Sequence, residues 1–337
     1  MLVCPKCFND KESELIEYIN SSGQEQQCEI CSSTNENSLE LDELLDFFET
    51  LLGNFQVSET GILLREKIQE DWNFFSSPQS ADTILKEVVK LIKTDISLTD
   101  KVDYVDSIRE NTTCWNKLKD ELRQSRRFFP DPKTLKCLKL ENSFNLSYQL
   151  DSNTELYRAR VHHKSGSEAY KPEEMMAPES QYTTSGRANP SGIPFLYLSE
   201  NEKTVVYEVR ASYLDELSIG VFKAKSDRKI EIVDFSEQDL LYQSDITNID
   251  QTIESQLLRN VISDDLSKPM RRYDSKLEYI STQFICEFIK FNTTADGIRF
   301  NSSLYKNGRN LVIFNDDQID CQAVSLKIVK VVDFEIE

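Results

Sequence analysis

Three side chains of different chemistry lie close together in the stretch from Ser185 to Glu208. An arginine, Arg187, is followed by a tyrosine, Tyr197, and then by a glutamate, Glu208. A guanidinium binds anions, an aromatic ring attracts a cationic ring, and a carboxylate stabilises positive charge. The spacing therefore fits a site for an anionic ligand that carries a ring. The same pattern is typical of a turn, a core strand and a surface helix, and the pattern alone favours this second interpretation.

Three short elements would have to position these side chains. Two glycines and two prolines in residues 186–194 predict an irregular loop around Arg187. The next segment, Phe195–Leu198, is short, apolar and aromatic, as in a strand. Residues 199–202 include good helix caps, so a helix that carries the glutamate is expected to follow.

The stretch resembles the core of the RES domain family, which is named for an Arg, a Glu and a Ser. Further blocks agree with that family in order and spacing over residues 151–330. They are Leu156–Arg160 with the sequence LYRAR, Thr204–Val209, Asp296–Ser303 and Asn310–Phe314. One departure is Ala188, where the family often carries an aromatic residue. The smaller side chain is expected to loosen the loop packing or to widen the ligand cleft.

The resemblance implies NAD as the substrate and a fold like that of ADP-ribosyltransferases. Breaking the bond between nicotinamide and ribose develops positive charge on the ribose, which a nearby carboxylate stabilises. The resemblance therefore assigns catalytic roles to Glu208, Arg158 and Ser302. It assigns NAD binding to Arg158 and Arg187 at the pyrophosphate, Tyr197 or else Tyr157 at the nicotinamide ring, and Ser302, with Ser303 as the alternative serine.

Ser302 is expected to bind the ligand and not to attack it. A serine nucleophile normally needs a neighbouring base. The two histidines, His162 and His163, both lie in the opening strand region, away from this serine in the sequence. Adjacent strand residues point to opposite faces, so we expect the histidines to be structural or exposed.

Two pairs of cysteines at the N-terminus predict a metal site. Cys4 and Cys7 form one C-x-x-C pair, and Cys28 and Cys31 form the second. Two such pairs supply the four thiolates of a tetrahedral zinc ion, with no position left open for catalysis. Residues 1–37 are therefore predicted to be a structural zinc knuckle, with a short helix over residues 12–20 between its halves.

Residues 38–132 are predicted to form a helical bundle. Apolar residues recur at helical spacing near Leu44, after Ser80 and near Trp115. The arrangement resembles the HEPN-like region that precedes some RES domains. Ribonucleases of that kind pair an Arg with a His, and this region contains no histidine. We therefore expect a bundle that does not cleave RNA.

The chain is expected to be multidomain, with a C-terminal α+β domain over residues 151–337 behind a connector, residues 133–150. The connector is expected to hold a helix over residues 134–140. The domain is expected to contain helices over residues 251–262 and 277–291. Its expected strands are residues 155–161, 195–198, 219–224, 230–233, 297–301, 310–314 and 323–334.

The composition limits the classes of partner. The net charge is −19, with −10 in residues 1–150 and −9 in the remainder. Direct nucleic-acid binding is not expected, because it needs clustered Lys and Arg. No apolar run is long enough for a membrane helix and no signal segment is recognisable, so a cytoplasmic protein is expected. In a reducing compartment the four scattered cysteines, Cys114, Cys137, Cys286 and Cys321, are expected to be buried free thiols.

The sequence therefore predicts an enzyme that consumes NAD by phosphorolysis or hydrolysis, acting as a bacterial toxin or anti-phage defence effector. Such an enzyme needs restraint, and the resemblance implies an antitoxin or a regulatory protein partner. A homo-oligomer is also compatible with these features. Two alternatives stay open. One is transfer of ADP-ribose to a macromolecule, and the other is a non-enzymatic zinc and helical adaptor whose RES domain has decayed.

Overall fold

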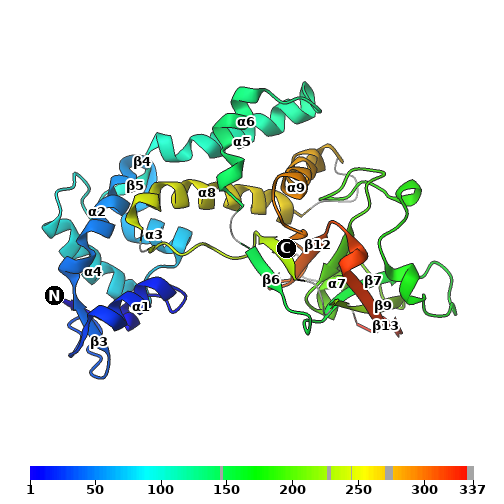
Figure 1. The fold of residues 1–337 in the computed structure, drawn as a ribbon, viewed down its shortest axis with the longest axis horizontal. Coiled ribbons are helices and arrows are strands. Elements are labelled where there is room, and N and C mark those ends of the chain that lie inside the picture. Colours follow the sequence, from blue (N-terminus) through cyan, green and yellow to red (C-terminus); the bar gives the residue numbers. More distant parts are fainter. Residues whose placement is uncertain (145–146, 226–228, 244, 270–275, 332–337) are drawn as a thin grey trace. The chain divides into compact units, whose positions relative to one another are not determined.

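The structure is a computed structural model that describes residues 1–144, 147–225, 229–243, 245–269 and 276–331. The chain divides into two compact units (Figure 1). The first contains Met1–Thr113 and Gln238–Leu257, and the second contains Cys114–Glu237 and Leu258–Glu337. From the sequence we predicted residues 238–257 to be part of the C-terminal domain. Their contacts instead place them in the first unit, together with the N-terminal residues.

The first unit opens with a small sheet around the cysteine pairs. Strands β1 (Leu2–Val3), β3 (Asn37–Glu40) and β2 (Gln24–Glu25) pair in that order, all antiparallel. Helix α1 (Ser13–Ser22) lies between β1 and β2 in the chain and confirms the helix expected near residues 12–20.

The rest of the first unit contains helices and one further sheet. The helices are α2 (Leu45–Gly53), α3 (Leu64–Trp72), α4 (Pro78–Leu91) and the start of α5 (Asp106–Gln124). The helix expected after Ser80 is α4, and the Ser77 hydroxyl caps it by accepting from the Ser80 amide over 3.1 Å. The region expected to be purely helical also holds strands β4 (Phe55–Leu63) and β5 (Lys101–Tyr104), which pair antiparallel.

The core of the first unit is a cluster of aromatic rings. Phe47, Phe48, Phe74 and Phe75 pack mainly edge to face, and Tyr242 joins them 5.1 Å from Phe47 between ring centroids. The segment that carries Tyr242 is also tied by the Glu12 carboxylate. That carboxylate accepts from the amides of Leu241 and Tyr242, each over 3.1 Å.

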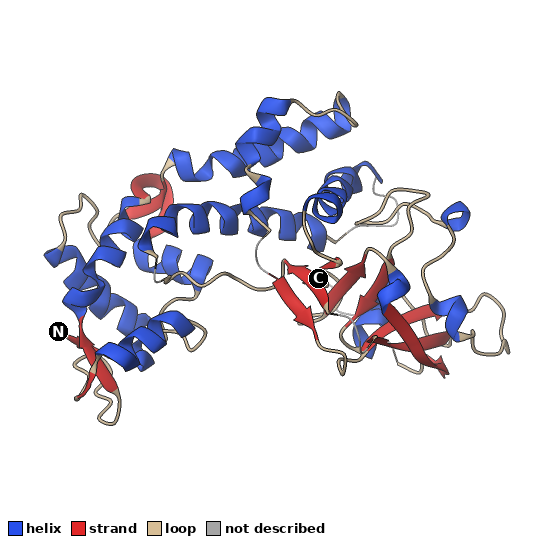
Figure 2. Ribbon diagram, viewed as in Figure 1, coloured by secondary structure: helices blue, strands red, loops and turns tan. Residues whose placement is uncertain are grey.

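The second unit is built on an eight-stranded mixed sheet (Figure 2). Its order is β13-β9-β7-β8-β12-β11-β10-β6, and among the described residues β10–β11 is the one parallel pair. The strands are β6 (Ser147–Leu150), β7 (Leu156–Val161), β8 (Leu196–Ser199), β9 (Glu216–Ala224), β10 (Ile230–Asp234), β11 (Gly297–Asn301), β12 (Arg309–Ile313) and β13 (Ile319–Ile328).

All seven expected strands are present, and β6 is an addition in the expected connector. The last expected strand is displaced, because β13 spans Ile319–Ile328 in place of residues 323–334. Residues 332–334 of the predicted strand lie outside the described residues.

The second unit also contains helices. They are α6 (Pro132–Leu138), α7 (Glu202–Glu208) and α9 (Ile280–Asn292), with parts of α5 and of α8 (Ile249–Ser267). The expected helices near residues 134–140, 251–262 and 277–291 are therefore confirmed. Buried residues of α9, among them Ile285 and Ile289, pack with Ile298 of β11 and Val312 of β12 in one core.

The sheet is nearly interrupted at its centre, and this interruption shapes the site. Strands β7 and β8 share one register pair, Tyr157 with Ser199. Beyond that pair, β7 runs beside β9 and β8 runs beside β12. The facing edges of β7 and β8 are therefore left to line an opening, which α7 borders.

The expectation for the scattered cysteines was wrong for two of the four. A disulfide joins Cys114 of α5 to Cys137 of α6. The two residues are 23 positions apart, and only the packing of these helices brings them together. Cys286 is a buried free thiol as expected, whereas the free thiol Cys321 is only half-buried.

No helix among the described residues combines the length and the apolar character that crossing a bilayer requires.

Candidate active site

A cavity of about 380 Å³ lies at the opening between β7 and β8. Its size is within the usual range for small-molecule sites. Polar and charged side chains reach it from β7, the loop of residues 185–194, β8, α7, the turn after β11, and β12. The lining consists of Arg158, Ala159, Arg187, Tyr197, Leu198, Ser199, Val205, Glu208, Val209, Leu266, Phe300, Ser303 and Asn310.

Glu208 is the carboxylate of this cavity, and two donors hold it. It is the last residue of α7, a helix capped by Asn201, whose side chain accepts from the Thr204 amide over 2.8 Å. The Ser302 hydroxyl and the Asn310 amide each donate to Glu208 Oε1 over 2.7 Å. Within the described residues no donor is found for Oε2, so this oxygen is available to a ligand.

Asn310 is a site residue that the sequence analysis did not single out. Its side-chain oxygen accepts from the Ser199 hydroxyl over 2.5 Å, which turns its amide nitrogen toward Glu208. The resemblance had marked the block Asn310–Phe314 without assigning a role to its first residue. A polar residue at the start of an otherwise apolar strand is the signal that could have found it.

Arg187 approaches the cavity from the loop of residues 185–194. Its guanidinium donates to the Leu266 carbonyl over 2.8 Å and to the Ser303 hydroxyl over 3.4 Å. It also lies 5.8 Å from the centre of the Tyr279 ring, within range of a cation–π contact. Burial lowers the pKa of Arg187, because the charged form is desolvated there.

Tyr197 organises the loop as well as lining the cavity. Its hydroxyl donates to Asn189 Oδ1 over 2.7 Å and accepts from the Ala188 amide over 3.0 Å. Gly186 must be a glycine here, since a Cβ would stand 2.6 Å from the Tyr197 hydroxyl. Ala188 is fully buried in the core under the loop and is not part of the cavity lining.

Helix α9 holds the same loop from its other side. The Thr282 hydroxyl donates to the Arg187 carbonyl over 2.6 Å. The Gln283 side-chain nitrogen lies within donating distance of the carbonyls of Gly186, at 2.7 Å, and of Asn189, at 3.1 Å. Both side chains are buried. The loop backbone is therefore fixed on both sides of Arg187.

Arg158 enters from β7. Its guanidinium donates to the Met176 carbonyl over 3.0 Å. Burial, and next the nearby Arg160, lower the pKa of Arg158 to about 10, so the side chain stays cationic at neutral pH.

Tyr157, proposed as the alternative ring-binding residue, is not among the residues that line the cavity. Its hydroxyl donates to Glu155 over 3.0 Å. The two serines take different places: Ser302 holds Glu208, whereas Ser303 lines the cavity beside Arg187. His162 stacks on Tyr170 and hydrogen-bonds Ser218, which agrees with the expected structural role.

The comparisons with known proteins identify the family of the second half of the chain. A scan against protein-family models matches the RES domain to residues 155–336, more than half of the 337 residues. The chain belongs to the RES domain family. A search of curated proteins and a search of solved structures give no match. Membership of the RES family suggests an NAD-related, toxin-like function, and every cavity-lining residue falls within the matched range.

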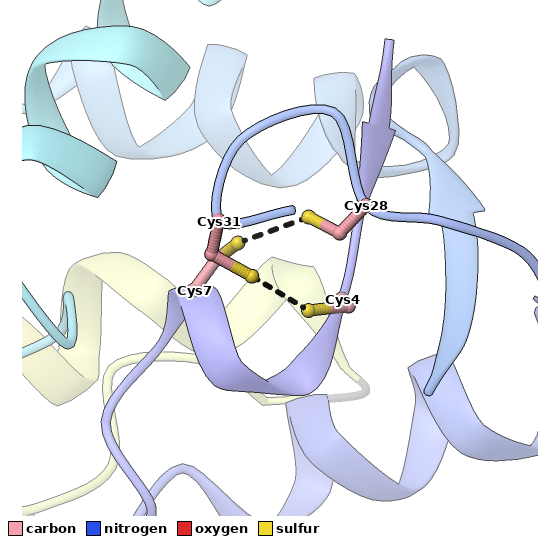
Figure 3. A group of neighbouring side chains, drawn as sticks. All are labelled: Cys4, Cys7, Cys28 and Cys31. Atoms are coloured by element: carbon pink, nitrogen blue, oxygen red, sulfur yellow. Dashed lines mark hydrogen bonds between the residues drawn. The ribbon is translucent and has the colours of Figure 1, made fainter. Parts of the chain in front are cut away.

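A second cluster of reactive side chains lies in the first unit, away from the RES match in the sequence. The thiols of Cys4, Cys7, Cys28 and Cys31 lie within 4.8 Å of one another (Figure 3). Four thiolates around zinc at about 2.3 Å would be separated by similar distances. Three of the four residues are buried, as in structural zinc sites. The cluster is therefore compatible with zinc held by these four cysteines.

Proposed function

We propose that this RES protein is an enzyme that breaks the bond between nicotinamide and ribose in NAD. One observation carries the proposal: the cavity holds a carboxylate fixed through one oxygen, together with two arginines that form no ion pair within the described part of the chain. Among the described residues, no carboxylate lies within ion-pair distance of Arg158 or Arg187. In a chain of net charge −19 such arginines are unusual, and the pyrophosphate of a dinucleotide would neutralise them.

The chemistry assigned to Glu208 follows from the charge that develops. As the bond from ribose C1′ to the nicotinamide nitrogen breaks, its electron pair leaves with the ring, which becomes neutral. Positive charge then builds on the ribose, and the open Oε2 of Glu208 would stabilise it. An oxygen nucleophile completes the reaction by bonding to C1′ and releasing its proton to solvent.

The remaining lining residues would bind and orient the substrate. The guanidiniums would hold the phosphoryl groups, and the Tyr197 ring would face the nicotinamide, as the resemblance implies. Ser302 is assigned a positioning role, because its hydroxyl proton is already directed at Glu208. We propose zinc as a structural ion of residues 1–37, and an antitoxin or regulatory partner as the restraint on the activity.

Product analysis tests the proposal and identifies the acceptor. Purified protein is incubated with NAD in matched buffers with and without inorganic phosphate. Free nicotinamide is the expected product in at least one buffer. ADP-ribose would identify water as the acceptor, ADP-ribose 1-phosphate would identify phosphate, and a labelled macromolecule would identify transfer. No nicotinamide release from folded protein under any of these conditions would refute the enzymatic proposal and favour the adaptor alternative.

A further inference from the structure

Arg160, two residues beyond Arg158 on β7, has no role in the function proposed above. Alternate residues of a strand share a face, so the two guanidiniums extend on the same side of the sheet. The Met176 carbonyl accepts from Arg158 over 3.0 Å and from Arg160 over 3.2 Å. Two cations are thus held next to each other by one neutral acceptor.

The shared carbonyl is itself fixed by the fold. The segment of residues 170–177 crosses this face of the sheet, and the Tyr170 amide donates to Ser218 over 2.9 Å. Met175 is fully buried and reaches Gly220, where a Cβ would meet its methyl carbon at 3.4 Å. The Ala177 amide donates to Asp316 over 3.0 Å. Anchors on both sides of Met176 therefore keep the arginines in a defined place.

The two guanidiniums have few direct partners among the described residues, although the Asp316 carboxylate lies close enough to favour the charged form of Arg158. Each guanidinium has five N–H donors, and one hydrogen bond is found for each among the described residues. In the part of the chain that the structure describes, no nitrogen of either guanidinium is a fully buried atom without a partner. No carboxylate within the described ranges lies within 4.0 Å of either guanidinium. Two neighbouring positive charges repel each other, and a bound anion would offset this unfavourable electrostatic energy.

We propose that Arg158 and Arg160 together form a subsite for a phosphoryl group, with Arg160 as its second ligand. Two planar donor groups side by side suit a tetrahedral phosphoryl anion better than one does. The proposal rests on the NAD function argued above. The phosphoryl group is supplied by the dinucleotide or by inorganic phosphate, and both sources present the same oxygens.

Binding measurements on Arg160→Gln test the subsite. They are made in the Glu208→Gln background, so that NAD is not consumed, and in phosphate-free buffer. Arg160→Gln is expected to weaken NAD binding by about 10- to 100-fold, the scale of a charge-assisted hydrogen bond. Nicotinamide riboside, which lacks the phosphoryl groups, should be affected by less than about twofold. Arg160→Lys, which keeps the charge without the fork, should recover part of the loss.

Lys164→Gln is the matched control, because it removes one positive charge from an exposed residue just after β7. A parallel series measures how inorganic phosphate raises the thermal midpoint, with chloride at equal ionic strength as its control. A change in NAD affinity identifies the dinucleotide as the source. A change confined to the phosphate series identifies inorganic phosphate.

The proposal is overturned if Arg160→Gln matches Lys164→Gln in both series. It is also overturned if Arg160→Gln only lowers the thermal midpoint, as loss of a merely structural arginine would. Failure of the proposed function gives a different result from failure of the subsite. In that case the protein with Arg160 intact would bind no NAD, while the phosphate series would still show whether the arginine pair binds an anion.

Discussion

The Ser302 hydroxyl donates to Glu208 Oε1 over 2.7 Å, and its oxygen accepts from the amides of Leu304 and Tyr305, each over 3.2 Å. The serine is therefore a bridge between the turn after β11 and the carboxylate at the end of α7. No histidine takes part in this arrangement, since His162 is bound to Ser218. The geometry favours a serine that aims the carboxylate over one that attacks the substrate.

Replacing Ser302 with alanine should weaken catalysis without abolishing it. The variant removes one of two donors to Glu208 Oε1 and leaves Asn310 in place. The expected loss in kcat is about 10- to 100-fold, the scale of one hydrogen bond to a charged group. Steady-state release of nicotinamide measures it. The positioning role would be contradicted if kcat fell as far as it does when a catalytic nucleophile is removed. A covalent adduct on Ser302 would contradict it as well.

Ser303→Ala is the matched control for this serine pair. Ser303 contacts Arg187 at 3.4 Å and does not hold the carboxylate. Its loss is expected to raise KM for NAD by a few fold, in the manner of a weakened binding contact, with kcat nearly unchanged.

Glu208→Gln should remove the charge and keep the shape. The amide oxygen can still accept from Ser302 and Asn310, so the fold and the position of the side chain are retained. We expect kcat to fall by at least about 100-fold, because in the proposed mechanism the carboxylate acts where positive charge develops. Glu202→Gln, on the same helix but outside the cavity lining, is the control and should retain activity. Wild-type turnover by Glu208→Gln would refute this mechanism.

Local patterns predicted most of the second unit, because its strands are short apolar runs and its helices carry one apolar face. The β4–β5 pair was not predicted, since Phe55 and Tyr104 meet only through packing across some fifty residues. The same limit applies to the Cys114–Cys137 disulfide and to the segment of Tyr242 in the first unit. Contacts between distant segments leave no periodicity in a single sequence.

The residues of the candidate site were likewise predicted only in part from the sequence. Arg158, Arg187, Tyr197 and Glu208 were identified through the resemblance, and the structure brings them to one cavity. Asn310 and Gln283 were missed because each acts on another residue through hydrogen bonds that only the fold creates. Ser302 and Ser303 are adjacent in the sequence, and only their partners in space assign them different places.

Glu12 should make the stability of the protein depend on pH. Burial raises the pKa of this carboxyl to about 7, against an ordinary value of 4.5. The folded state therefore holds the proton more tightly than the unfolded state. The stabilisation is complete below about pH 4.5 and is lost as pH rises toward 7, by up to about 3 kcal/mol. Glu12→Gln carries no titrating proton, so its unfolding free energy should fall less between pH 5 and 8. Denaturant titrations at several pH values measure the unfolding free energy of both proteins. An equal change of this free energy with pH in the wild type and in Glu12→Gln would contradict the assignment.

The four N-terminal cysteines should hold one zinc ion per chain. Their thiols lie close enough for a tetrahedral site, and structural zinc contributes directly to folding. Elemental analysis of protein purified without added metal checks the stoichiometry. Cys28→Ser should lower the zinc content and the thermal midpoint, while NAD cleavage per folded molecule is retained. Soluble, folded wild-type protein with no bound metal would show that the cluster is a set of reduced thiols.

Gln283 should control how firmly NAD is bound, although it does not line the cavity. Its side chain is buried and donates to the loop backbone beside Arg187. Gln283→Leu keeps most of the volume and removes these donors, so Arg187 loses its fixed position. We expect KM for NAD to rise about tenfold with a smaller change in kcat, since the contact at stake is one of binding. Gln256→Leu, a change of the same type at a buried glutamine of the first unit, is the control for stability. If both variants lower the thermal midpoint equally and neither changes KM, Gln283 supports the fold without positioning the arginine.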